Sequence, residues 1–111
     1  MPAKFEIMKR RAGQYTYNLL ASNGIIILNS GFFTSKSDVI SNIEAVKRYA
    51  SSNESYQRSS TDGDGAYFVL KGPDGNILGR SKHYLSIAGL EKGIASVMRN
   101  APRAVVKDWT L

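Results

Sequence analysis

The sequence contains no cysteine, which excludes disulfide bonds and thiolate zinc sites as sources of stability. It contains no long hydrophobic run either. The longest, GIIIL at residues 24–28, has the length of a strand, whereas a membrane-spanning helix needs about 20 apolar residues. The N-terminal segment carries basic residues without the apolar stretch of a secretory signal. These absences predict a cytoplasmic protein that has no membrane partner.

The chain of 111 residues is long enough for one compact domain or two very small ones. A lone unit of about 50 residues buries too little surface to be stable without disulfides or a metal. Two halves, if present, should therefore share a core. The net charge is +6, from 15 Lys and Arg against 9 Asp and Glu. A basic surface favours acidic partners such as nucleic acid, although it serves equally well as a plain solvated surface.

An internal repeat organises the chain, because residues 5–50 align with residues 56–101 at an offset of 51 without a gap. Nine aligned pairs are identical: Leu19 and Leu70, Gly24 and Gly75, Ile26 and Ile77, Ser30 and Ser81, Ser35 and Ser86, Ile43 and Ile94, Val46 and Val97, Arg48 and Arg99, and Ala50 and Ala101. We expect a single domain over residues 1–111 that consists of these two repeats, with a C-terminal strand and tail at 102–111.

Each repeat predicts three strands. They cover residues 4–10, 14–21 and 25–30 in the first repeat, and 54–60, 65–72 and 76–81 in the second. The dipeptides Asn23-Gly24 and Asp74-Gly75 predict two-residue type I′ turns that join the second strand to the third.

A helical period follows the third strand of each repeat. The apolar stripe is Val39, Ile43, Val46 and Ala50 in the first repeat, and Leu90, Ile94, Val97 and Ala101 in the second. Ser35 and Ser86 are the predicted N-caps. The second helix contains Gly89 and Gly93, which predict close packing of that face on another backbone, because a helical glycine costs about 1 kcal/mol. Residues 103–109 predict a final strand.

The predicted fold class is α+β: tandem β-β-β-α(-β) repeats with pseudo-twofold symmetry and an antiparallel sheet packed against two helices. The aromatic-rich strand, the Asn/Asp-Gly turn, the pattern S-x-x-[FY]-x-S and the segment GIASVMRN resemble the YegP-like family of uncharacterised bacterial proteins. The resemblance covers nearly the whole chain and implies a continuous sheet whose terminal strands are exchanged between the units. Asn42, Ala45 and Ile87 depart from the family pattern. The resemblance implies no established activity, cofactor or catalytic residue.

No catalytic, cofactor-binding or metal-binding residue is predicted. His83 is the sole histidine, the chain has no G-x-S-x-G turn, and Phe32 occupies the position of His83 in the first repeat. Residues 62–65, DGDG, resemble a calcium loop, but Pro73 stands where an EF-hand needs its final glutamate. Neither phosphate-loop pattern, G-x-x-x-x-G-K-[ST] or G-x-G-x-x-G, follows a strand. We expect that the protein is not an enzyme.

The remaining hypothesis is binding, either of a protein partner or of nucleic acid. The loop with Lys9, Arg10 and Arg11 is basic, whereas its counterpart in the second repeat is acidic. Sheets that bind nucleic acid place cations beside exposed aromatic rings. The candidate contacts for an anion or a nucleic acid are therefore Lys9, Arg10, Arg11, Arg80, Lys82 and Tyr67. We expect a monomer, because one chain already contains two units, with a homodimer as the alternative.

Overall fold

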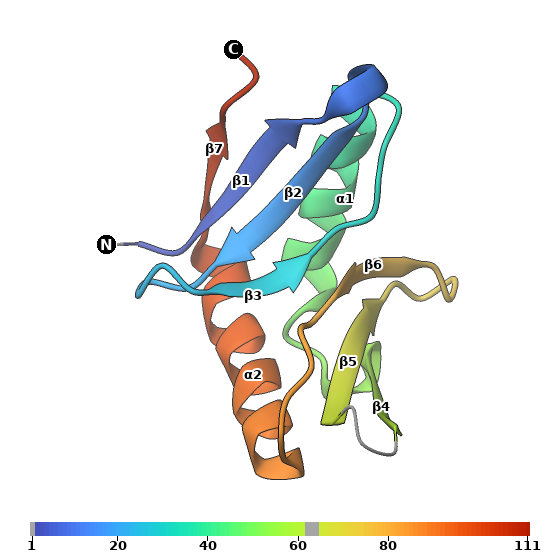
Figure 1. Cartoon of the computed structure of the whole chain (residues 1–111), viewed down its shortest axis with the longest axis vertical. Helices are drawn as coiled ribbons and strands as arrows, with labels where there is room; N and C mark the ends of the chain where they lie inside the picture. Colours follow the sequence, from blue (N-terminus) through green and yellow to red (C-terminus); the bar gives the residue numbers. More distant parts are fainter. Residues whose placement is uncertain (1, 62–64) are drawn as a thin grey trace.

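The computed structural model of the chain describes residues 2–61 and 65–111 (Figure 1). The first repeat forms β1 (Lys4–Lys9), β2 (Tyr15–Leu20), β3 (Ile26–Asn29) and α1 (Lys36–Tyr49). The second forms β4 (Tyr56–Thr61), β5 (Gly65–Lys71), β6 (Ile77–Arg80) and α2 (Ile87–Asn100), and is followed by β7 (Val105–Asp108). Short 3-10 turns lie at η1 (Arg11–Gly13), η2 (Asn53–Ser55) and η3 (Ala101–Arg103). The predicted α+β fold with tandem repeats is confirmed.

All strands join one seven-stranded sheet with the order β4-β5-β6-β3-β2-β1-β7. Neighbours are antiparallel except β7, which runs parallel to β1, so the sheet is mixed rather than wholly antiparallel. β3 and β6 meet at its centre through one ladder pair, Asn29 opposite Arg80. These two residues occupy the same position in their repeats. A pair of equivalent residues that face each other marks a pseudo-twofold axis between the two halves.

Both helices pack on the same face of the sheet, and the core lies between the helices and the sheet (Figure 1). α1 packs on β2 of its own repeat and β6 of the other, whereas α2 packs on β5 and β3. The predicted helix stripes are confirmed, since all eight residues named for them are buried. The N-caps are confirmed as well. The Asp38 N–H donates to Ser35 Oγ at 3.2 Å, and the Gly89 N–H donates to Ser86 Oγ at 3.0 Å.

The turn between β2 and β3 differs from the prediction, as does its counterpart between β5 and β6. Among the described residues other than glycine, Ala12 alone has a positive φ, so Asn23 and Asp74 do not adopt the type I′ conformation. Instead, the Gly24 N–H donates to the Ala21 carbonyl at 2.9 Å, and Gly24 itself has a φ of 85°. This is a three-residue loop that ends in a left-handed glycine. The Asn23 side chain supports it by accepting the Ile25 N–H at 3.0 Å.

A buried hydroxyl joins the two repeats. The Tyr17 phenol of β2 donates to the Leu78 carbonyl of β6 at 2.6 Å and lies 2.7 Å from Asn42 Oδ1 of α1. Burial raises the pKa of Tyr17 well above its usual range. The phenol is therefore a neutral donor that bonds the first repeat to a backbone group of the second.

In the second repeat, Phe68 and Gly93 occupy the positions of Tyr17 and Asn42. The phenol hydroxyl of this repeat belongs to Tyr84 instead. Tyr84 stacks on Phe68 with ring centroids 6.3 Å apart. A Cβ at Gly93 would lie 2.5 Å from Tyr84 Cζ, so a larger residue there would displace the Tyr84 ring. The prediction that the helical glycines pack on another backbone is thus wrong for Gly93, because its neighbour is an aromatic side chain.

Candidate binding surface

The face of the sheet opposite the helices, which we call the open face, is covered by no described helix (Figure 1). One residue from each strand forms a continuous row across it. From β4 to β7 this central row reads Gln57, Val69, Arg80, Asn29, Asn18, Glu6 and Lys107. Their neighbours along the chain, such as Phe5, Ile7 and Phe68, are buried on the helix side. Because side chains alternate along a strand, the central row points away from the core.

Positive charge gathers on the open face. Lys4, Arg80 and Lys107 belong to it by register, and Arg10 joins them because its Nε donates to Thr16 Oγ1 at 3.0 Å. Thr16 alternates with the core residue Tyr17 and therefore lies on the open face.

Negative charge is placed elsewhere. Among the described residues, Glu6 is the one carboxylate in these open-face rows. The others lie in helices, in connections or on the opposite side of a strand: Asp38, Glu44, Glu54, Asp74, Glu91 and Asp108. Two of them are neutralised locally. Arg58 binds Glu91 through both carboxylate oxygens, at 2.5 Å and 3.0 Å, and Lys36 Nζ lies 3.0 Å from Asp108 Oδ2.

Aromatic rings mark both halves of the open face. Tyr67 of β5 is half-buried, and its ring centroid lies 5.2 Å from that of the exposed His83. At the other end, Trp109 is 56% exposed, and its indole N–H donates to Glu6 Oε2 at 2.9 Å. Lys107 Nζ lies 4.8 Å from the Trp109 ring centroid. Five inter-strand steps separate β5 from β7, so the two strands that carry these aromatic groups lie roughly 24 Å apart across the sheet.

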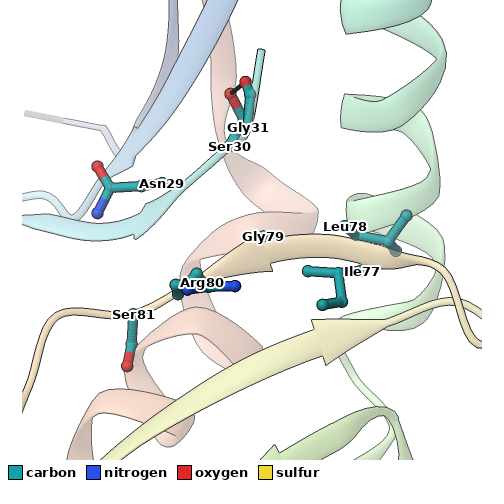
Figure 2. A pocket seen from close by; sticks show the side chains of 8 residues that line it. All are labelled: Asn29, Ser30, Gly31, Ile77, Leu78, Gly79, Arg80 and Ser81. Carbon is teal, nitrogen blue, oxygen red and sulfur yellow. Dashed lines mark hydrogen bonds between the residues drawn. The ribbon is translucent and has the colours of Figure 1, made fainter. Parts of the chain in front are cut away.

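A groove of about 460 Å³ lies beside the central row, where β3 and β6 part after their single ladder pair (Figure 2). One side is formed by Asn29, Ser30 and Gly31, and the other by residues 77–81 of β6 and its end. Arg80 is exposed at this groove and makes no ion pair with any described residue. Its guanidinium is therefore available to an anion, and the Asn29 side chain borders the same groove.

The six predicted contact residues do not all lie on one face of the sheet. Arg10, Arg80 and Tyr67 lie on the open face. Lys9 and Lys82 instead lie near the helix-side rings of Tyr15 and Tyr84, at 5.9 Å and 5.4 Å from the ring centroids. Arg11 is exposed in η1, at the far end of the β1–β2 hairpin from β6 (Figure 1). The acidic loop that was compared with this basic end, and the calcium-like DGDG segment, fall largely on residues 62–64, outside the described residues.

Sequence reasoning did not select Trp109, Lys107 or Glu6 as contacts. Their proximity depends on the parallel pairing of β7 with β1, in which Lys107 faces Glu6. The two strands are about 100 residues apart in the sequence, and no local pattern links them. The available signal was the aromatic residue beside cations at the end of the final predicted strand, in the letters KDW.

Features of an enzyme site are sparse in the described part of the chain. It contains no group of three His, Cys, Asp or Glu side chains that could hold a metal ion. His83 contacts the Tyr67 ring. No described helix is long and apolar enough to cross a bilayer.

Comparisons with known proteins identify close relatives. The domain of unknown function DUF1508 matches residues 11–57 and again residues 62–108. UPF0339 protein YegP of Yersinia pestis is 39% identical over 107 residues, which span 96% of each chain. A UPF0339 protein of Pseudomonas aeruginosa is 35% identical and covers 97% of this chain, which spans 98% of that protein. The solution structure of YegP from E. coli, described as a protein of unknown function, matches with a TM-score of 0.91 at 34% identity, over 98% of this chain and 94% of that one.

Proposed function

The chain belongs to the UPF0339 family of tandem DUF1508 proteins, as its motifs predicted, and we propose that it is a non-enzymatic binding module whose ligand lies on the open face. The family has no characterised activity. The proposal therefore depends on the surface itself and on the chemistry of the side chains that it presents.

The uneven layering of the fold supports this proposal most strongly. A seven-stranded sheet carries both helices on one face, and none of the described helices covers the other. The open face is mostly polar along its central row, so it is not a hydrophobic surface that must be buried for stability. Exposed rings of His83 and Trp109 accompany that row, and exposed aromatic and charged side chains are typical of recognition surfaces.

Site-specific photo-crosslinking in cells tests the location of the binding surface even while the ligand is unidentified. A photoreactive residue at Asn18, in the central row, should give ligand adducts. The same residue at Glu44, on the solvent side of α1, should give none above background. Adducts that form from position 44 and not from position 18 would overturn the proposal.

We expect the purified protein to sediment as a monomer, and a homodimer would place a second copy among the occupants of the open face.

Nucleic acid is the second candidate function, and the distribution of charge favours it. Lys4, Arg10, Arg80 and Lys107 share the open face with one described carboxylate, Glu6. A ligand with regularly spaced negative charge would match that arrangement. Binding of this kind weakens steeply as the salt concentration rises, and substitution of Arg10 should weaken it regardless of base sequence.

A further inference from the structure

We infer that the ligand of the open face is single-stranded nucleic acid, laid across the strands, with bases stacked on Trp109 at one end and on the Tyr67–His83 pair at the other. The inference rests on the proposed binding function and names its ligand class. It also assigns Arg80, on the strand next to Tyr67 and four strands from β7, to a backbone phosphate.

The spacing of the rings favours a single strand over a duplex. The strands that carry the two aromatic groups lie roughly 24 Å apart across the sheet, and an extended segment of several nucleotides spans such a distance. Bases in a duplex are stacked on each other, so their flat faces are closed to protein rings. A single strand exposes those faces, and every base can stack whatever its sequence.

Each end of the surface combines a ring with polar partners that hold it. Trp109 is oriented by the bond from its indole N–H to Glu6, while most of the ring stays exposed. Lys107 Nζ lies over one face of the ring, 4.8 Å from its centroid, so the base would stack on the opposite face. Tyr67 is supported by its neighbour His83, whose exposed ring is tilted by 58° to it and offers a second ring face to a base.

The centre of the surface suits a phosphate. Arg80 is exposed at the groove between β3 and β6 and has no carboxylate partner among the described residues. A guanidinium binds phosphate through two parallel N–H donors. Asn29 and Asn18 continue the central row toward Trp109, and their amides can bond either to phosphate or to base edges.

Substitution of Glu6 distinguishes a role of this surface in nucleic-acid binding from a purely structural role. Its carboxylate, whose Oε2 lies 3.7 Å from Lys4 Nζ, is the one described negative charge on this path, and its counterpart in the second repeat is Gln57. Glu6→Gln keeps an acceptor for the Trp109 indole and removes the charge. We expect it to tighten binding roughly threefold at low salt, because one repulsion with the phosphates is lost.

The experiment uses the full chain and a fluorescein-labelled oligothymidylate of about 12 nucleotides, followed by anisotropy at low and high salt. Trp109 is the only tryptophan, so its own fluorescence reports base stacking in parallel. We expect quenching by the single strand, weaker binding of a duplex of equal length, and affinity that falls with salt. An oligouridylate arm distinguishes DNA from RNA.

Trp109→Ala should weaken binding about fivefold or more, and Tyr67→Ala should do the same. Leu111→Ala is the matched control, since it removes a fully exposed apolar side chain two residues from Trp109. It should leave the affinity unchanged. Thermal melts of each variant establish that the fold is intact, and Trp109→Phe, which retains a stacking ring, should recover much of the loss.

Three results would overturn the inference: no binding of either single strand at low salt, equal or tighter binding of the duplex, or wild-type affinity in both Trp109→Ala and Tyr67→Ala. If no oligonucleotide binds while photo-crosslinks from position 18 persist, the ligand class is wrong and the binding surface stands. Loss of those crosslinks instead refutes the proposed function itself.

Discussion

The side chain of Leu28 in the first repeat packs against Gly79, its counterpart in the second repeat. The pseudo-twofold axis brings these equivalent positions together, and a Cβ built on Gly79 would lie 2.7 Å from both Cγ and Cδ2 of Leu28. Two large side chains cannot occupy the axis at once. At these equivalent positions one repeat therefore carries a large side chain and the other carries none.

Gly79→Ala should destabilise the fold by about 1–3 kcal/mol, because the added methyl group overlaps a leucine that is fully buried. Leu28→Ala should cost about 2–5 kcal/mol through the cavity that it leaves. The double variant should be more stable than the sum of the two effects predicts, since each change relieves the other. Urea unfolding of the four proteins measures this coupling, and strict additivity would show that the two positions do not share space.

Tyr17→Phe should lower the free energy of unfolding by about 1–3 kcal/mol, because the buried Leu78 carbonyl loses its donor. Tyr84→Phe is the matched control. The Tyr84 hydroxyl makes no hydrogen bond with the described residues, so the change should stay within about 0.5 kcal/mol. Equal effects of the two substitutions would argue against the hydroxyl link between the repeats.

Asp108 should remain ionised to unusually low pH. Its carboxylate accepts the Thr110 hydroxyl at 2.6 Å and the Thr110 N–H at 2.8 Å, and these bonds, with Lys36 beyond them, lower its pKa to about 2. Because the folded pKa lies below the unfolded value of about 3.9, the contribution to stability is present above pH 4 and is lost as the pH falls toward 2.

Thr110→Val removes the hydroxyl and keeps the backbone donor, so the Asp108 pKa should rise toward its ordinary value. A carboxyl-carbon NMR titration measures it. Thr34 is an exposed threonine before α1, and Thr34→Val is the control, which should leave the pKa of Asp108 unchanged. An Asp108 pKa that is the same in wild type and Thr110→Val would contradict the assignment of these bonds.

We propose that residues 1–111 form a single cooperative domain. α1 packs on β6 of the other repeat and α2 packs on β3, so each half supplies part of the core of its partner. Fragments 1–52 and 53–111 should each be unfolded in isolation, with collapsed amide dispersion in NMR spectra. A folded spectrum from either fragment alone would contradict this proposal.

Much of the fold was predictable because its determinants are local. The serines that cap the helices act within three residues, and the helix stripes follow from a period that is visible in the letters. The turn type was predicted wrongly because Asn-Gly suits two loop lengths. The choice between them depends on the register of the flanking strands, which the dipeptide does not encode.

The candidate surface was less predictable than the fold. Whether Arg80 and Tyr67 share a face follows from strand pairing across the whole sheet, and Trp109 reaches Glu6 only because β7 docks parallel to β1. Basic residues that are adjacent in sequence, such as Lys9 and Arg10, point to opposite sides of the hairpin. Charge composition alone therefore could not identify which cations act together.

The location of the nucleic-acid surface is tested most directly by two charge reversals that change the net charge equally. Arg80→Glu lies at the centre of the open face, and Lys92→Glu lies exposed on α2, on the other side of the sheet. Oligothymidylate binding at low salt should weaken about tenfold or more in Arg80→Glu and about twofold or less in Lys92→Glu. Equal losses in the two variants, or a greater loss in Lys92→Glu, would contradict an open-face binding surface.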